Sequence, residues 1–155
     1  MDERDLMHLR RSLELARAAR AGGNHPFGSL VVAAGGGLLA EAANTVGIDG
    51  PTGHAETNVV RAVARVDAAT LRSATLYTST EPCAMCAGAI YWSGIGRVVY
   101  ALGEDALHAM TGDDPANPTM ALPCREVFGR GQRPMVVEGP ALVEEARAVH
   151  EGFWR

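Results

Sequence analysis

Two cysteines set the strongest constraint on how this chain can fold. Cys83 and Cys86 are separated by two residues, a spacing that lets both sulfur atoms face one metal ion. Two thiolates do not complete a metal site, so a further ligand has to come from elsewhere in the chain. His54 is the candidate, because it begins the sequence His-Ala-Glu at residues 54–56. The fold is therefore expected to bring residues 54–56 and 81–86 together.

Length and composition indicate an ordinary globular protein. A chain of 155 residues fits a single domain, residues 1–155, that is long enough to bury a core. The formal net charge of −4 argues against a large nucleic-acid surface, because phosphate binding requires a basic face. Three cysteines do not make a disulfide framework, and no segment resembles a signal peptide or a membrane span. These features predict a cytoplasmic protein with no membrane contact.

The hydrophobic pattern alternates between strand and helix periods. Apolar residues at helical spacing predict helices, and short apolar runs predict strands. The predicted helices cover about 1–21, 52–63, 82–93 and 140–154, and the predicted strands cover 27–33, 38–42, 75–79, 98–102 and 134–138. Pro82 is expected in the first turn of its helix, and residues 103–131 are expected to form a long loop or short helical pieces.

This order of elements predicts an α/β protein with three layers. Strands that alternate with helices favour one mostly five-stranded sheet with helices on both faces. The glycines at 35–37 are expected to turn the first two strands into a hairpin. The sheet should therefore be mixed, and the fold is expected to be a three-layer α/β/α arrangement.

Both candidate metal motifs fall where helices are predicted to begin. Free N–H groups and the positive end of the helix dipole favour a thiolate there, which is the form that zinc binds. Ligation by His54, Cys83 and Cys86 would leave the fourth position of a zinc ion open for water, whose pKa falls toward about 7 on zinc. Glu56 is then placed to act as a general base for that water and afterwards as a general acid.

Two other interpretations of the cysteine pair remain open. A redox pair usually follows a thioredoxin-like βαβ start, which this sequence lacks. A structural zinc site needs four ligands, and Cys124 is the one candidate for the fourth. That arrangement would leave Glu56 without a function. The sequence therefore favours one catalytic Zn²⁺ per subunit, with Cys124 as a small buried hydrophobic residue.

The order H-x-E followed by P-C-x-x-C is typical of zinc deaminases that act on nucleobases. The chain resembles the cytidine-deaminase-like superfamily over nearly its whole length. The matching segments are Pro26–Gly28, Asn44, Pro51–Glu56 and Thr75–Trp92. Within that superfamily, the sequence is most similar to the bacterial guanine deaminases and nucleoside deaminases. The C-terminal segment, residues 129–155, differs and resembles the tRNA adenosine deaminases or the fungal-type cytosine deaminases.

The resemblance implies a set of substrate-binding residues around the catalytic Glu56. It implies that Asn44 bonds the purine, that Phe27 and Trp92 help to form the pocket walls, and that Asp113 or Asp114 contacts the base edge. It also places Ala55 and Glu81 at the substrate, with Glu81 assisting proton movement. Each side chain also has a purely structural interpretation, as part of the core, of a turn or of a solvated loop.

The function expected from the motifs and the resemblance is hydrolytic deamination of a free nucleobase, foremost guanine to xanthine and ammonia. The alternatives are deamination of cytosine, of a nucleoside (guanosine, adenosine or cytidine) or of a triazine. Deamination of adenosine in tRNA is disfavoured by the acidic balance. A binding module without activity is disfavoured by Glu56, since nothing structural requires a carboxylate beside the metal. The resemblance also implies a homodimer.

Overall fold

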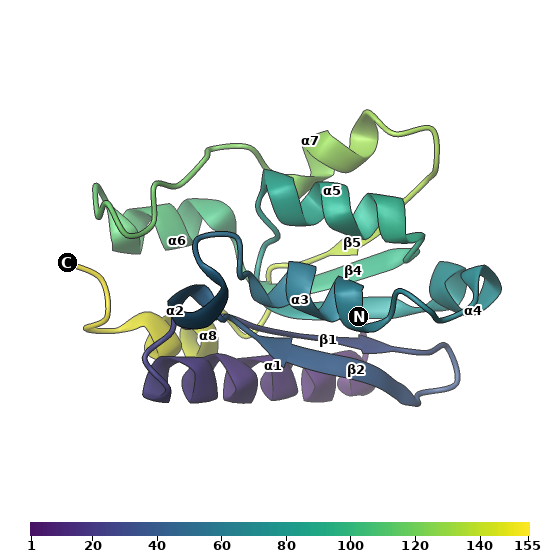
Figure 1. The fold of residues 1–155 in the computed structure, drawn as a ribbon, viewed down its shortest axis with the longest axis horizontal. Helices are drawn as coiled ribbons and strands as arrows, with labels where there is room; N and C mark the ends of the chain where they lie inside the picture. The colour runs from purple at the N-terminus through teal and green to yellow at the C-terminus, as the bar shows by residue number, and fades with distance from the viewer.

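A five-stranded mixed sheet forms the centre of the computed structural model, which describes all residues 1–155 (Figure 1). Its strands are β1 (Gly28–Val32), β2 (Leu38–Ala43), β3 (Thr75–Thr80), β4 (Arg97–Leu102) and β5 (Val136–Glu138). They lie in the order β2-β1-β3-β4-β5. β1 runs antiparallel to β2 and β3, whereas β3, β4 and β5 are parallel. The prediction of a mixed five-stranded sheet is confirmed.

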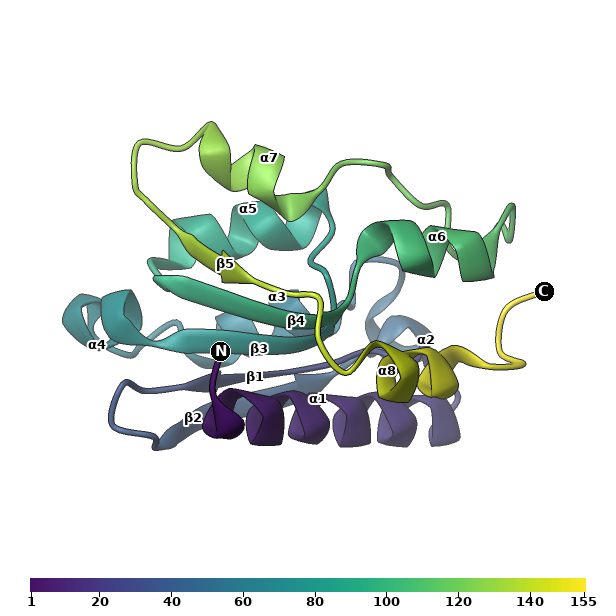
Figure 2. The ribbon, with the colours of Figure 1, turned by 180° about the vertical axis from the view of Figure 1, so that it is seen from behind.

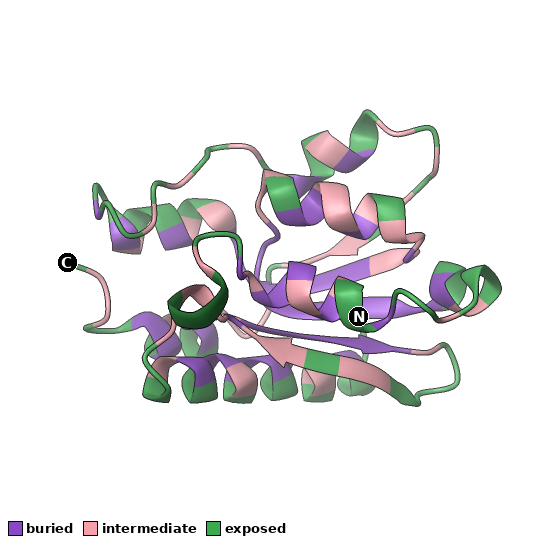
Figure 3. Cartoon of the chain, viewed as in Figure 1, coloured by how far each residue is buried: buried purple, intermediate pink, exposed green.

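Helices cover both faces of this sheet, so the three-layer prediction is also confirmed. One face carries α1 (Glu3–Ala21) and α8 (Val143–His150) (Figure 2). The other face carries α3 (Ala55–Ala62), α5 (Ala84–Ser93) and α7 (Cys124–Gly129). Two hydrophobic clusters result, one on each face, and the strands β1 and β3 between them are buried along their whole length (Figure 3). None of the helices combines the length and the apolar character that crossing a membrane requires.

The segments that follow the parallel strands β3 and β4 lie at the carboxyl ends of these strands. Parallel strands need a crossover, and α5 supplies it between β3 and β4. After β4, α6 (Glu104–Thr111) begins beyond the carboxyl end of the strand, and residues 112–123 then lead to α7. In open α/β sheets, ligands bind outside the carboxyl ends of the strands, here those of β3 and β4.

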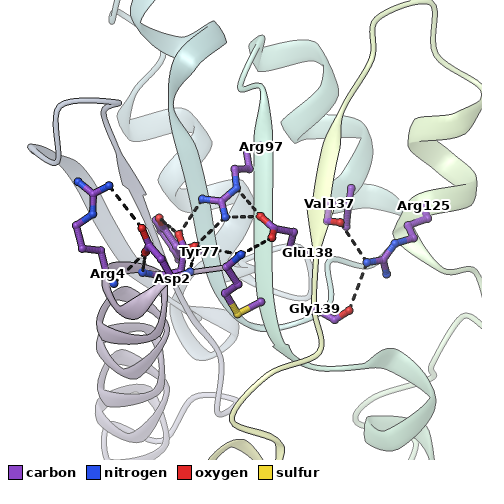
Figure 4. Close-up of polar contacts among 10 residues, drawn as sticks. Asp2, Arg4, Tyr77, Arg97, Arg125, Val137, Glu138 and Gly139 are labelled. Carbon is purple, nitrogen blue, oxygen red and sulfur yellow. Dashed lines mark hydrogen bonds and ion pairs between the residues drawn. The ribbon is translucent and has the colours of Figure 1, made fainter.

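An ion-pair network fastens the start of α1 to the sheet at the amino-terminal end of β4 (Figure 4). Arg97 on β4 donates two hydrogen bonds of 2.8 Å to the Asp5 carboxylate and also bonds Glu138 on β5. The Tyr77 hydroxyl donates to Asp5 at 2.7 Å. These bonds, those from Arg97 foremost, hold the pKa of Asp5 well below its usual range. The network ties α1, β3, β4 and β5 together, away from the candidate metal ligands.

Four local features differ from the sequence-based expectation. The short helices α2 (Val46–Asp49) and α4 (Ala68–Ser73) were not predicted, although Asp67 caps α4 by accepting from the Thr70 N–H. Pro82 stands before the N-cap of α5 and outside its first turn. The last helix begins at Val143, because Ala141 N–H first bonds the Ala101 carbonyl and extends the chain along β4. Residues 153 and 154 therefore follow α8 and do not belong to it.

Candidate metal centre and substrate cavity

Two helix starts bring the candidate metal ligands together. His54 is the N-cap residue of α3, Cys83 is the N-cap residue of α5, and Cys86 lies in the first turn of α5. His54 Nδ1 lies 3.6 Å from Cys83 Sγ and 3.4 Å from Cys86 Sγ. The three ligand atoms all lie within 4.8 Å of one another. The predicted meeting of the two motifs is confirmed, with both at helix N-termini.

The distances between these atoms fit a zinc ion. Zinc–sulfur bonds of about 2.3 Å and zinc–nitrogen bonds of about 2.0 Å at tetrahedral angles place nitrogen and sulfur about 3.5 Å apart. A hydrogen bond from Cys86 lowers the pKa of the Cys83 thiol to about 4, which favours the thiolate. Cys124 is fully buried and is not part of the cluster. The site therefore has three protein ligands, the number found in catalytic zinc sites.

Glu56 lies beside this centre with one oxygen held in place. Its Oε1 accepts a 2.8 Å hydrogen bond from the Thr78 hydroxyl on β3, and its Oε2 lies 3.5 Å from Cys86 Sγ. The side chain is 5% exposed, and burial raises the pKa of its carboxyl group. A raised pKa favours the uptake of a proton, which is what a general base must do.

A cavity of about 670 Å³ adjoins the centre and shares His54, Glu56 and Cys83 with it. This volume is in the usual range for small-molecule sites. The remaining lining residues come from several segments and include His25, Phe27, Thr80, Leu107 and residues 115–120. Three carboxylates line the cavity, no arginine does, and the chain contains no lysine. The cavity is therefore rich in hydrogen-bond acceptors and has no guanidinium or ammonium group.

Two of these carboxylates, Glu81 and Glu104, lie on the segments that follow β3 and β4. Both Glu81 oxygens are used within the chain, since they accept from the N–H groups of Cys124 at 2.9 Å and Glu104 at 3.0 Å. Glu81 therefore holds the starts of α6 and α7. The Glu104 carboxylate has no hydrogen bond or ion pair within the chain, and burial, with the nearby charge of Cys83, raises its pKa to about 7.

The predicted substrate contacts are only partly at the cavity. Phe27 and Glu81 line it. Asn44 is 2% exposed and does not line the cavity, but its Oδ1 accepts from the N–H groups of the lining residues His25 at 3.3 Å and Val46 at 3.0 Å. Ala55 is fully buried and does not line the cavity.

Three predicted contacts lie outside the cavity of this chain. Trp92 is 85% exposed, because the side of α5 that meets the core is formed by Cys86, Ala87 and Ile90. Asp113 is exposed and does not line the cavity. Asp114 is buried, and its carboxylate is occupied by the N–H groups of Ala116 and Arg155. The structure therefore does not bring Trp92 or the acidic pair to the metal centre.

Sequence reasoning missed several residues that do line the cavity. They include Glu104, Leu107 and residues 115–120, all from the segment that was expected to be a loop or short helices. The position of Glu104, two residues after the end of a strand parallel to β3, is a signal that could have found it.

Known proteins with related sequences and structures match this site and fold. Residues 2–102 match the family described as the cytidine and deoxycytidylate deaminase zinc-binding region. The probable cytosine deaminase of Schizosaccharomyces pombe is 38% identical over 154 residues, which cover 99% of this chain and 94% of that protein. The guanine deaminase of Bacillus subtilis is 43% identical over 96 residues, which cover 60% of this chain and 61% of that protein.

A solved structure of the guanine deaminase from Nitrosomonas europaea has the same fold. Its TM-score to this chain is 0.73 at 30% identity, and the match covers 92% of this chain and 80% of the other. The ligand geometry, the family match and the near-full-length relative agree on the chemistry of the site. The chain therefore belongs to the cytidine and deoxycytidylate deaminase family and is a zinc-dependent deaminase, a hydrolase that acts on carbon–nitrogen bonds.

Proposed function

We propose that this chain deaminates a free nucleobase, with guanine to xanthine and ammonia as the first candidate reaction. The acceptor-rich cavity beside the metal centre carries this proposal. Guanine presents several N–H donors, on its ring nitrogens and its exocyclic amine, and the lining carboxylate of Glu104, which has no partner in the chain, can accept from one of them. The likeness to guanine deaminases of known structure supports the same substrate.

Each residue of the site has a distinct role in this proposal. His54, Cys83 and Cys86 hold the zinc ion, which when bound supplies a Lewis acid and a nucleophile derived from water. Glu56 takes up a proton at its free oxygen and delivers it to the departing amine nitrogen. Thr78 keeps the Glu56 carboxyl group oriented through its 2.8 Å hydrogen bond. Phe27 and Leu107 provide apolar surface for the ring and exclude water.

Cytosine is the second candidate, because the relative that spans nearly the whole chain is described as a probable cytosine deaminase. A nucleoside or a triazine would use the same chemistry. Deamination of adenosine within tRNA fits less well, since an RNA loop brings phosphates and no arginine lines the cavity.

Ammonia release from a panel of compounds tests the proposal. Zinc-loaded protein is incubated separately with guanine, cytosine, adenine and the corresponding nucleosides. We expect turnover of guanine with the largest kcat/KM. A larger kcat/KM for cytosine would identify cytosine, and not guanine, as the substrate. A larger kcat/KM for a nucleoside would argue against a free base. The absence of ammonia from every compound would contradict the proposed function.

We also propose that residues 1–155 act as one deaminase domain within a homodimer that forms through α5. Trp92 is 85% exposed and Met85 is 39% exposed on this helix, and aromatic residues and methionine are enriched at protein interfaces. Met85 also lines the cavity, so a partner seated on α5 would lie near the substrate. None of the three cysteines forms a disulfide, which supports a reducing compartment such as the cytoplasm.

A further inference from the structure

Glu104 is the one carboxylate in the cavity whose oxygens have no partner in the chain. Glu56 accepts from Thr78, and Glu81 accepts from two backbone N–H groups. Glu104 is half-buried in the same cavity and takes part in no ion pair or side-chain hydrogen bond. The carboxylate oxygens of Glu104 are not among the buried atoms that lack a partner, so they stay accessible in the cavity and can accept a hydrogen bond from a ligand.

We propose that Glu104 is a substrate-recognition residue, which bonds an N–H group of an uncharged base or nucleoside and disfavours phosphorylated substrates. This inference rests on the proposed function and deepens it by naming a residue that recognises the substrate. Neither the zinc signature nor the Glu56 motif includes Glu104, which comes from the start of α6.

The backbone around Glu104 fixes where its side chain starts. Its own N–H donates to Glu81 Oε2 at 3.0 Å, so the first residue of α6 is tied to the segment that carries Cys83. Gly103 precedes it at a crowded position, since a Cβ there would lie 2.7 Å from the Asp105 carboxylate. A side chain on a helix whose first residue is fixed by such bonds is positioned more precisely than one on a loop.

A second polar group without a partner lies on the neighbouring strand end. Thr80 is 2% exposed, lines the cavity and has a buried hydroxyl oxygen with no hydrogen-bond partner. Thr80 pairs in register with Leu102 on β4, two residues before Glu104. Thr80 at the end of β3 and Glu104 at the start of α6 therefore both line the cavity, and each has a polar group without a partner in the chain, as expected of a site that bonds a polar ligand.

The charge of the cavity determines which ligands it accepts. Three carboxylates face it and no arginine offsets them. Above its pKa of about 7, Glu104 is charged and would repel a phosphate group, which would also find no bidentate partner. An uncharged base or nucleoside supplies N–H donors instead, and a hydrogen bond to a charged group contributes more than one between neutral groups.

The experiment compares Glu104→Gln with Asp105→Asn, which makes the same charge change at the next residue. Asp105 is exposed and does not line the cavity. For the best substrate of the panel, Glu104→Gln should raise KM by about 10- to 100-fold and change kcat by less than about threefold. It should also lower the inhibition constant of the matching nucleoside monophosphate by about threefold or more. Asp105→Asn should change none of these values.

Zinc content and circular dichroism of both variants establish that each is folded and loaded. An unchanged KM for Glu104→Gln, or a fall in kcat alone, would overturn the recognition role while leaving the proposed function intact. If the wild-type protein releases no ammonia from any compound, the proposed function fails and this inference fails with it. Unchanged inhibition by the monophosphate would overturn the part that concerns phosphorylated substrates.

Discussion

The backbone N–H of Arg155 donates a 2.7 Å hydrogen bond to Asp114 Oδ2 and so fastens the end of the chain to the segment after α6. Asp114 Oδ1 accepts from the Ala116 N–H at 2.9 Å, and residues 115–120 line the cavity. The residue before Arg155, Trp154, packs against Phe27 and His25, which also line the cavity. The C-terminus therefore supports two parts of the cavity wall.

Breaking this hydrogen bond should weaken substrate binding. We expect Asp114→Ala to raise KM by severalfold, about 1 kcal/mol, because residues 115–120 lose their attachment, while kcat changes little. Asp113→Ala is the matched control, since its side chain is exposed. Deleting Arg155 removes the same bond from the other side. The double change should therefore be no worse than Asp114→Ala alone, which already removes the bonds to both Ala116 and Arg155. Additive effects would show that Arg155 supports the cavity independently of Asp114.

Replacing Glu56 by Gln should abolish proton transfer without emptying the metal site. The amide keeps the shape of the side chain but cannot take up a proton, so kcat should fall by about 10²- to 10⁴-fold. Thr78→Val, which removes the 2.8 Å hydrogen bond to Glu56, should have a smaller effect in the same direction. Steady-state kinetics and metal analysis of each variant provide the check. Full activity of Glu56→Gln would remove Glu56 from the mechanism.

The cysteines should differ in their effect on zinc. Cys83→Ser replaces one of the three metal ligands and should reduce the metal content well below one ion per chain, with loss of activity. Cys124→Ala should keep one zinc ion per chain and lose only stability, because Cys124 is a fully buried residue outside the cluster. Elemental analysis of the purified variants measures the zinc. Loss of zinc from Cys124→Ala would favour a structural site with four ligands.

The parts of the fold that were predictable follow from local patterns. The five strands, α1 and the meeting of His54 with Cys83 and Cys86 were predicted, since strand alternation and ligand spacing are local properties. The cavity walls were not, because they depend on which segments meet at the sheet edge. Trp92 and Asp114 show this, as one is exposed and the other bonds the backbone of the C-terminal residue. Glu104 is a candidate for substrate binding because the end of β4 lies beside the end of β3, a pairing that the sequence does not state.

Stability should depend on pH through His150. This residue is 2% exposed, accepts a hydrogen bond from the Trp154 indole at 3.2 Å, and has a pKa that burial lowers to about 4. Between the unfolded pKa of about 6.5 and pH 4, the unfolded chain binds a proton that the folded chain excludes. The free energy of unfolding should therefore fall by up to about 3 kcal/mol as the pH is lowered through this window.

Chemical unfolding of wild type and His150→Leu at several pH values tests this contribution. The difference between their pH slopes isolates His150, because any effect of zinc release is common to both proteins. His108→Leu is the control, since His108 is exposed on α6. Parallel slopes for wild type and His150→Leu would contradict the prediction.

The exposed indole of Trp92 should decide the oligomeric state. A side chain that is 85% exposed on a helix rich in apolar residues gains most by burial against a second copy of α5. Trp92→Glu should therefore convert a dimer to a monomer in light scattering coupled to size-exclusion chromatography. Leu38→Glu is the control, because Leu38 is 55% exposed on β2, an edge strand of the sheet. A wild-type monomer at micromolar concentration would contradict the homodimer. A rise in KM that accompanies dissociation would show that the partner supports the cavity. Such an effect has a structural basis, because Met85 lies on α5 and also lines the cavity.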